Sequence, residues 1–398
     1  MTAIDSARER SRTPGCGSGH HLNAAGAALP TTATLETVID YLRVEAFTGG
    51  YEAARQSSER IDRTYAAVAT LSGCAADEVA LVDSATRAWH VAVASLRLQR
   101  GDRVIVTRSE YVSNALMLLT LERELGIVIE VVGTTPEGTT DLDEMEACLE
   151  AGGAALVAIG HIPTYSGLVE PVEAVGVLAR RFGVPFVLDA TQSLGQLPVD
   201  VDRLGCDILV STGRKFLRGP RGTGILIVRR PLLDRLEPWV PDVRGAEWNG
   251  DRTWELRDGA RRFETFEHSP ALRLGLGSAV EQTLELGVDA ISERIVTLAG
   301  DLRSRLAETA AVELADPAPA GSGIVTFTVD GMAAPAVVEH LAAHGVYLVS
   351  VPASHGQWEF GRRDHEAVVR ASVHVYNDGR DFAALTEALE KLPVDMRA

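Results

Sequence analysis

Short, continuous runs of aliphatic residues recur along the first two thirds of the chain, and a helix-length segment separates most of them. Because these runs lack the polar alternation of a half-exposed strand, both faces of each strand must be covered. The runs lie at residues 81–83, 102–106, 127–132, 155–159, 186–189, 208–211 and 224–228. They predict an α/β fold with a mostly parallel, seven-stranded sheet. In such a sheet, ligands bind beyond the carboxyl ends of the strands.

The pattern changes after residue 272, where a long helical stretch leads into short strands and helices. This change predicts a large domain over residues 20–272 and a small α+β domain over residues 273–398. We expect residues 20–35 to pack on the small domain. Residues 1–19 are rich in Ser, Arg, Gly and Thr and have few large apolar side chains, so they predict a mobile tail.

Charge and hydropathy argue against several classes of partner. The formal net charge is −17 and the pI is about 5.1, so the chain as a whole repels nucleic acid. No apolar run reaches the roughly 18 residues of a membrane span. The 4 cysteines are widely spaced and form no CxxC pair, so we predict no metal site and expect a reducing, cytoplasmic location.

Lysine is rare in this chain, which has only Lys215 and Lys391 among its 38 basic residues. A primary amine can lose its proton when it is desolvated or flanked by cations, and it can then attack a carbonyl, which a guanidinium does not do. Lys215 follows a predicted strand and lies among several arginines, a setting that favours amine chemistry. An ordinary surface lysine is the alternative.

A carboxylate and an amide lie near Lys215 in the predicted sheet. Asp189 ends a buried strand, where a carboxylate is costly unless it meets a cation, although a helix N-cap is an alternative role. Gln192 follows closely, and Lys215 ends the next strand. A carboxylate that protonates a heteroaromatic nitrogen, an amide, and a lysine that forms a Schiff base together predict a pyridoxal phosphate site.

A phosphate cradle is predicted at the start of the helix that follows the first strand. Ser84, Ala85 and Thr86 would present backbone N–H groups and hydroxyls at a helix N-terminus, which is a ready anion site. Thr212 and Arg214 would add donors from the far side of the phosphate.

Together these motifs resemble the fold-type I pyridoxal phosphate enzymes, in particular the class V aminotransferase family. That family includes cysteine desulfurases, isopenicillin N epimerase-like proteins and C–S lyases of ergothioneine and lincosamide pathways. The resemblance runs from about His21 to Asn377 and is most specific over residues 188–216.

The resemblance implies which side chains contact the cofactor. They are Lys215 in the Schiff base, Asp189 at the pyridinium nitrogen, Gln192 and Thr164 at the ring oxygen, Thr86 and Thr212 at the phosphate, and Tyr111 stacked on the ring. Arg370 is expected to bind the substrate carboxylate through two parallel hydrogen bonds, with Asn23 and Tyr165 as further substrate contacts. Tyr165 and His161 are candidate acid–base groups, and packing roles are the alternative for both.

Departures from the family pattern narrow the reaction. Residues 350–358 carry no cysteine where desulfurases place a nucleophilic thiol, so a persulfide-forming activity is disfavoured. We therefore predict a C–S β-lyase that converts an S-substituted L-cysteine to a thiol, pyruvate and ammonia, in actinobacterial secondary metabolism. Decarboxylation-coupled oxidative deamination, transamination and epimerisation are alternatives. A ligand-sensing regulator is disfavoured, because it would need a basic DNA-binding module, for which the 19-residue tail is too short and the net charge has the wrong sign.

The resemblance also implies a homodimer with shared active sites. Arg221, Glu267 and His268 are the residues expected to reach across the subunit interface.

Overall fold

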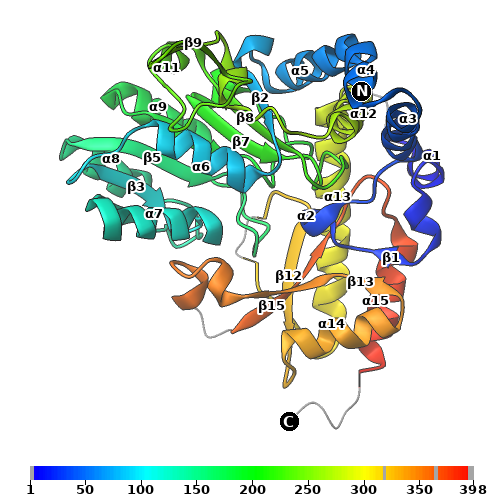
Figure 1. Ribbon diagram of the computed structural model, residues 1–398. Coiled ribbons are helices and arrows are strands. Elements are labelled where there is room, and N and C mark those ends of the chain that lie inside the picture. The colour runs from blue at the N-terminus through cyan, green and yellow to red at the C-terminus, as the bar shows by residue number, and fades with distance from the viewer. Residues whose placement is uncertain (1–3, 317–319, 363–365, 393–398) are drawn as a thin grey trace.

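The computed structural model describes residues 4–316, 320–362 and 366–392, which fold into two layered units (Figure 1). The larger unit is built on a seven-stranded sheet with the order β2-β8-β7-β6-β5-β3-β4. Its strands are β2 (Val79–Val82), β3 (Arg103–Thr107), β4 (Val128–Val132), β5 (Ala154–Gly160), β6 (Phe186–Asp189), β7 (Ile208–Thr212) and β8 (Gly224–Val228). Strand β8 runs in the direction opposite to the other six strands. The predicted fold class is therefore confirmed.

Helices cover both faces of this sheet, because successive residues of a strand point to opposite sides. Along β5, Val157 and Ile159 enter one hydrophobic core and Leu156 and Ala158 enter another. The helices on the first face are α5 (Ser58–Ser72), α8 (Leu142–Glu150) and α9 (Val172–Phe182), and those on the second are α6 (Ala85–Ser95) and α7 (Val112–Leu125). This two-sided burial explains why the strands are continuously apolar.

The smaller unit is an antiparallel four-stranded sheet with the order β11-β12-β15-β14, packed against helices. Its strands are β11 (Val312–Leu314), β12 (Ile324–Val329), β14 (Val349–Pro352) and β15 (Ala367–Ser372). The helices are α13 (Val288–Glu308), α14 (Ala334–Ala343) and α15 (Gly379–Glu390), and α12 (Pro270–Leu286) precedes them. Phe327 and Phe382 are fully buried in its core.

A segment near the N-terminus crosses to this smaller unit. Strand β1 (His20–His21) pairs in parallel with β13 (Val346–Tyr347), and Asn23 forms a bridge with Ser372 at the end of β15. Figure 1 shows this segment beside the small sheet. The remaining elements are α2 (Ala24–Ala27), α3 (Thr32–Thr48), α4 (Gly50–Gln56), α10 (Val201–Leu204), α11 (Arg230–Leu233) and the hairpin of β9 (Ala246–Gly250) and β10 (Thr253–Leu256). No helix in the described ranges is long and apolar enough to span a bilayer.

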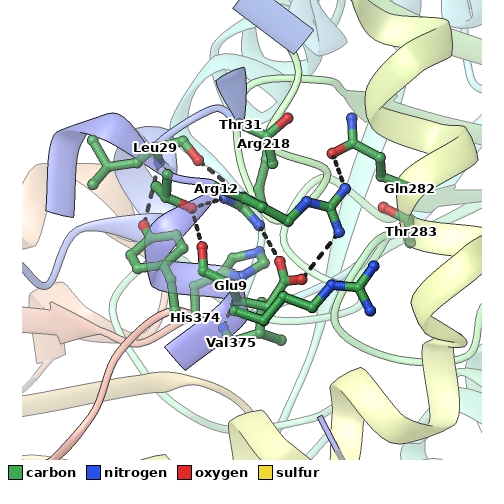
Figure 2. Close-up of polar contacts among 12 residues, drawn as sticks. Glu9, Arg12, Leu29, Thr31, Arg218, Gln282, Thr283, His374 and Val375 are labelled. Atoms are coloured by element: carbon green, nitrogen blue, oxygen red, sulfur yellow. Dashed lines mark hydrogen bonds and ion pairs between the residues drawn. The ribbon is translucent and has the colours of Figure 1, made fainter. Parts of the chain in front are cut away.

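The start of the chain differs from the mobile tail that its composition predicts. Helix α1 (Ser6–Ser11) is capped by Asp5, and Glu9 on that helix is only 2% exposed. A Glu9 carboxylate oxygen lies 3.1 Å from Nη1 of Arg218 (Figure 2). The reason for the difference is a partner 209 residues away, which local composition does not reveal.

Arg218 joins this N-terminal segment to the loop that carries Lys215. Its Nε donates to the carbonyl of Leu29 at 2.9 Å, another of its nitrogens donates to the Thr13 hydroxyl, and its backbone N–H donates to the carbonyl of Lys215. Arg218 also has a φ of 62°, which a non-glycine residue adopts only when its surroundings hold it there. The N-terminal segment therefore supports the lysine loop from behind.

We expect Glu9→Ala to lower the free energy of unfolding by about 3–5 kcal/mol, because it leaves the buried Arg218 guanidinium without its anion. Arg8→Ala is the matched control, since Arg8 lies on the same helix and is exposed. Urea unfolding followed by circular dichroism measures both changes. Equal effects of the two substitutions would show that the ion pair contributes nothing to stability.

Candidate active site

A pocket lies at the carboxyl ends of the central strands, where the parallel sheet predicts a ligand. It gathers side chains from the loops after β2, β3, β5, β6 and β7. All ten residues predicted to bind the cofactor line it: Ser84, Ala85, Thr86, Tyr111, Thr164, Asp189, Gln192, Thr212, Arg214 and Lys215. Residues from different loops meet here because the strands that precede them are neighbours in one sheet.

Lys215 follows β7 and is only 6% exposed. Burial lowers the pKa of its amine well below the ordinary value, and the guanidinium groups of Arg214 and Arg370 lower it further. The carboxylate of Asp189 acts in the opposite direction. Nζ of Lys215 lies 6.0 Å from the centroid of the Tyr111 ring. A buried amine flanked by cations can be neutral near physiological pH, which is the state that a nucleophile or general base requires.

Asp189 is the last residue of β6 and is 7% exposed. One carboxylate oxygen accepts from Nδ2 of Asn114 at 2.8 Å, and the other accepts from the backbone N–H of Thr191 at 2.9 Å. No helix of the described chain begins at this residue, so the alternative of a helix N-cap does not apply. The Asp189 carboxylate lines the pocket and has no ion-pair partner among the described residues. It is therefore available to pair with a protonated ring nitrogen.

Gln192 and Thr164 lie side by side in the lining of the pocket. Nε2 of Gln192 lies 3.3 Å from Oγ1 of Thr164, and its buried Oε1 has no hydrogen-bond partner among the described residues. A buried amide oxygen without a partner is costly, which indicates a polar group that the pocket receives from outside the chain.

The anion cradle has the expected form. Ser84 caps α6 through a hydrogen bond that its Oγ accepts from the backbone N–H of Arg87, and the free N–H groups of Ala85 and Thr86 begin an 11-residue helix. Arg214 adds a positive charge, and within the described chain no carboxylate pairs with it. A helix N-terminus beside an unpaired guanidinium suits a phosphate group.

Arg370 lies on β15 of the smaller unit and adjoins this pocket through Thr164, which lines it. Its Nη1 donates to the backbone carbonyl and the hydroxyl of Thr164 at 2.9 and 2.7 Å, and its Nη2 donates to Oδ1 of Asn23 at 3.2 Å. Burial lowers the pKa of Arg370 to about 10, so the side chain remains a cation at neutral pH. No carboxylate in the described ranges pairs with it, and its buried Nε has no partner there. The structure thus brings Asn23 and Arg370 together beside the pocket.

Tyr165 and His161, like Arg370 and Asn23, are not among the residues that line the pocket. Tyr165 stacks on Phe360 with ring centroids 5.2 Å apart, inside a small hydrophobic cluster of the smaller unit. His161 is 5% exposed, and burial lowers its pKa to about 4, so it is neutral at pH 7. Their geometry favours the packing alternative over acid–base catalysis.

Two side chains of the site, Asn114 and Glu110, were not anticipated. Asn114 lies in the first turn of α7, and its Nδ2 donates both to Asp189 and to Oε1 of Glu110. Their spacing of one helical turn was a signal in the sequence, but nothing local indicates that the pair faces Asp189. Elsewhere in the described ranges, no group of three His, Cys, Asp or Glu side chains could hold a metal ion.

A buried amine, a carboxylate for a ring nitrogen and a cradle for a phosphate meet in one pocket, and the guanidinium of Arg370 adjoins it. Pyridoxal 5′-phosphate meets each of these requirements with its aldehyde, its pyridine nitrogen and its phosphate. The fold and the pocket therefore define a pyridoxal phosphate-dependent enzyme.

Comparison with known proteins places the chain more closely. The family model for class V aminotransferases matches residues 20–385. A probable cysteine desulfurase of Halalkalibacterium halodurans is 28% identical over 391 residues, covering 93% of this chain and 92% of that protein. A probable hercynylcysteine sulfoxide lyase of Mycobacterium tuberculosis is 28% identical over 372 residues, covering 93% of this chain and 89% of that protein.

Among solved structures, the apo cysteine desulfurase of Thermococcus onnurineus NA1 superimposes with a TM-score of 0.91 at 24% identity, covering 98% of this chain and 99% of that one. The protein belongs to the class V aminotransferase family, and the resemblance inferred from its motifs is confirmed.

Proposed function

We propose that the protein is a C–S β-lyase that converts an S-substituted L-cysteine and water to a thiol, pyruvate and ammonia. The observation that carries this proposal is the absence of a thiol from the pocket: Cys16, Cys74, Cys148 and Cys206 are all described, and none lines it. A desulfurase needs a thiolate to take up the sulfur atom. Without one, the sulfur leaves with its substituent, as in a β-elimination.

The residues of the pocket divide the work of such an elimination. When bound, the cofactor delocalises the electron pair left at the substrate α-carbon. Arg370 binds the α-carboxylate, and the neutral amine of Lys215 takes the α-proton. The C–S bond then breaks, the sulfur departs with the electron pair and takes up a proton, and water hydrolyses the remaining three-carbon fragment to pyruvate and ammonia.

Product analysis with a panel of S-substituted cysteines and their sulfoxides tests this reaction. We expect sulfur-containing product and pyruvate in equal amounts, without oxygen uptake, for the substrates that are turned over. Lys215→Ala serves as the control for adventitious cleavage. Carbon dioxide and an aldehyde formed with oxygen consumption would assign the oxidative deamination instead. Alanine formed with a protein-bound persulfide would assign a desulfurase.

We further propose a homodimer. Several large apolar side chains are exposed beside a groove between α6, α7 and the loop before β9: Leu116 is 59%, Trp239 is 61% and Val240 is 76% exposed. Thr86 lines both this groove and the cofactor pocket, so a second subunit seated in the groove would adjoin the phosphate cradle. Light scattering distinguishes such a dimer from a 42.5 kDa monomer.

The residues expected to reach across the interface support the same arrangement. Glu267 and His268 line a surface hollow together with Gly222 and Thr223, and Arg221 is exposed next to it. A cytoplasmic location and a role in actinobacterial secondary metabolism stay predictions.

A further inference from the structure

Glu110 is buried between the end of β3 and the start of α7, at 2% exposure. Its Oε1 accepts hydrogen bonds from the backbone N–H of Tyr111 at 2.8 Å and from Nδ2 of Asn114 at 2.9 Å. Its Oε2 is also buried and has no hydrogen-bond partner among the described residues. Within the described ranges, no arginine, lysine or histidine forms an ion pair with the carboxyl group of Glu110.

The same amide nitrogen links Glu110 to the cofactor pocket. Nδ2 of Asn114 donates to Oδ2 of Asp189 at 2.8 Å as well as to Glu110. An amide nitrogen has two protons, so each carboxyl group receives one of them. Two carboxylates bridged in this way repel each other, and a pair buried together relieves the repulsion when one of them keeps its proton.

We propose that Glu110 is a positioning residue that keeps its proton in the folded protein up to about neutral pH and there leaves Asp189 as the single anion of the pair. The role of that anion at the ring nitrogen rests on the cofactor site described above. As a neutral acid, Glu110 still accepts through Oε1, so it orients the backbone of Tyr111 and, through Asn114, the carboxylate of Asp189. One buried group thus aligns two side chains of the pocket.

The charges around Glu110 explain why it is the protonated member. Burial raises the pKa of Glu110 most, and the charge of Asp189 raises it further, to about 7, against the lowering effect of its two hydrogen bonds. Asp189 lines the pocket, with the guanidinium of Arg214 and the amine of Lys215 on the neighbouring loop. The other titratable groups around the segment, His161 after β5 and Glu170 before α9, make no hydrogen bond or ion pair with Glu110 among the described residues.

The pH dependence of stability tests the proposal on the apoprotein, without any catalytic readout. When folding raises the pKa of an acid, the free energy of unfolding falls as pH rises from the pKa of the unfolded chain, about 4.3 for Glu, to the pKa of the folded protein. Above the folded pKa, this loss of stability no longer changes with pH. Glu110→Gln removes this loss while keeping the Oε1 acceptor. We therefore expect the melting temperature of the variant, relative to wild type, to rise by a few degrees between pH 5 and pH 8.

Glu124→Gln is the matched control, because Glu124 is exposed near the end of helix α7, which Glu110 precedes. The difference in melting temperature between Glu124→Gln and wild type should not change between pH 5 and pH 8. A Glu110→Gln difference that is equally flat would overturn the proposal, since it would mean that Glu110 is ionised throughout. This result is independent of whether the C–S lyase reaction is correct.

The positioning role is tested on the cofactor-loaded protein with Glu110→Gln and Glu110→Ala. Glutamine reproduces the shape and the acceptor of the neutral acid, whereas alanine removes the acceptor for Tyr111 and Asn114. Cofactor affinity is measured from the absorption spectrum of the bound cofactor. We expect Glu110→Gln to lower this affinity at least about tenfold less than Glu110→Ala does. Equal losses would show that the charge of Glu110 is required, which contradicts a neutral acid.

Discussion

Lys215→Ala is expected to lower turnover by at least about 10³-fold, while the cofactor remains bound with reduced affinity. The substitution removes the amine whose pKa is lowered by burial and by two neighbouring guanidinium groups. The phosphate cradle and Asp189 stay in place, so binding weakens but is not abolished. Steady-state kinetics and the absorption spectrum of the bound cofactor measure the two effects separately.

Lys391→Ala is a control supplied by the chain itself, because it changes the one other lysine. Lys391 follows the last turn of α15 and is exposed, far in sequence from every pocket residue. Its replacement should leave turnover unchanged. Borohydride reduction followed by peptide mapping should label Lys215 alone. A label on Lys391 would refute the assignment of the reactive amine.

Most of the large unit could be predicted because its information is local. A run such as residues 155–159 is apolar at every position, and the structure buries both faces of that strand. Strands that neighbour each other in a parallel sheet end at one edge, so Asp189 after β6 and Lys215 after β7 had to meet. The ten expected cofactor contacts line one pocket for this reason.

The features that sequence analysis missed depend on partners distant in sequence. Glu9 is buried only because Arg218 reaches it, and the composition around Glu9 is that of a solvated tail. Asn114 faces Asp189 across 75 residues of chain. Periodicity identifies the helix that carries Asn114 but gives no register against another loop, so neither contact had a local signal.

Tyr165 is a residue for which the motif left two roles open, a substrate contact and packing, and the structure favours packing. Its position in the loop after β5 indicated a substrate contact, yet its ring turns toward the smaller unit and stacks on Phe360. Gly356 lies so close that a Cβ there would come within 2.0 Å of the Tyr165 ring. A sequence motif gives the residue but not the direction of its side chain, because that direction is set by the loop opposite.

The second large effect is expected at Arg370, whose guanidinium has no anion among the described residues. Arg370→Ala should raise KM for an amino-acid substrate by about 10²-fold or more, since two charge-assisted hydrogen bonds to the carboxylate are lost. We expect kcat to fall as well, by about tenfold, because the carboxylate fixes which substrate bond lies in line for cleavage. Arg380→Ala, at an exposed position of the smaller unit, is the control for charge removal.

Arg370→Lys separates charge from geometry. A lysine keeps the positive charge but cannot donate two parallel hydrogen bonds from one planar group. Compared with Arg370→Ala, Arg370→Lys should therefore bring KM part of the way back to the wild-type value and restore little of kcat. It also cannot hold Thr164 and Asn23 at the same time, which Arg370 contacts through Nη1 and Nη2. An unchanged KM in both variants, with the cofactor spectrum intact, would mean that the substrate carboxylate binds elsewhere. Full recovery by lysine would mean that charge alone selects the substrate, and that the fork does not orient the bond that breaks.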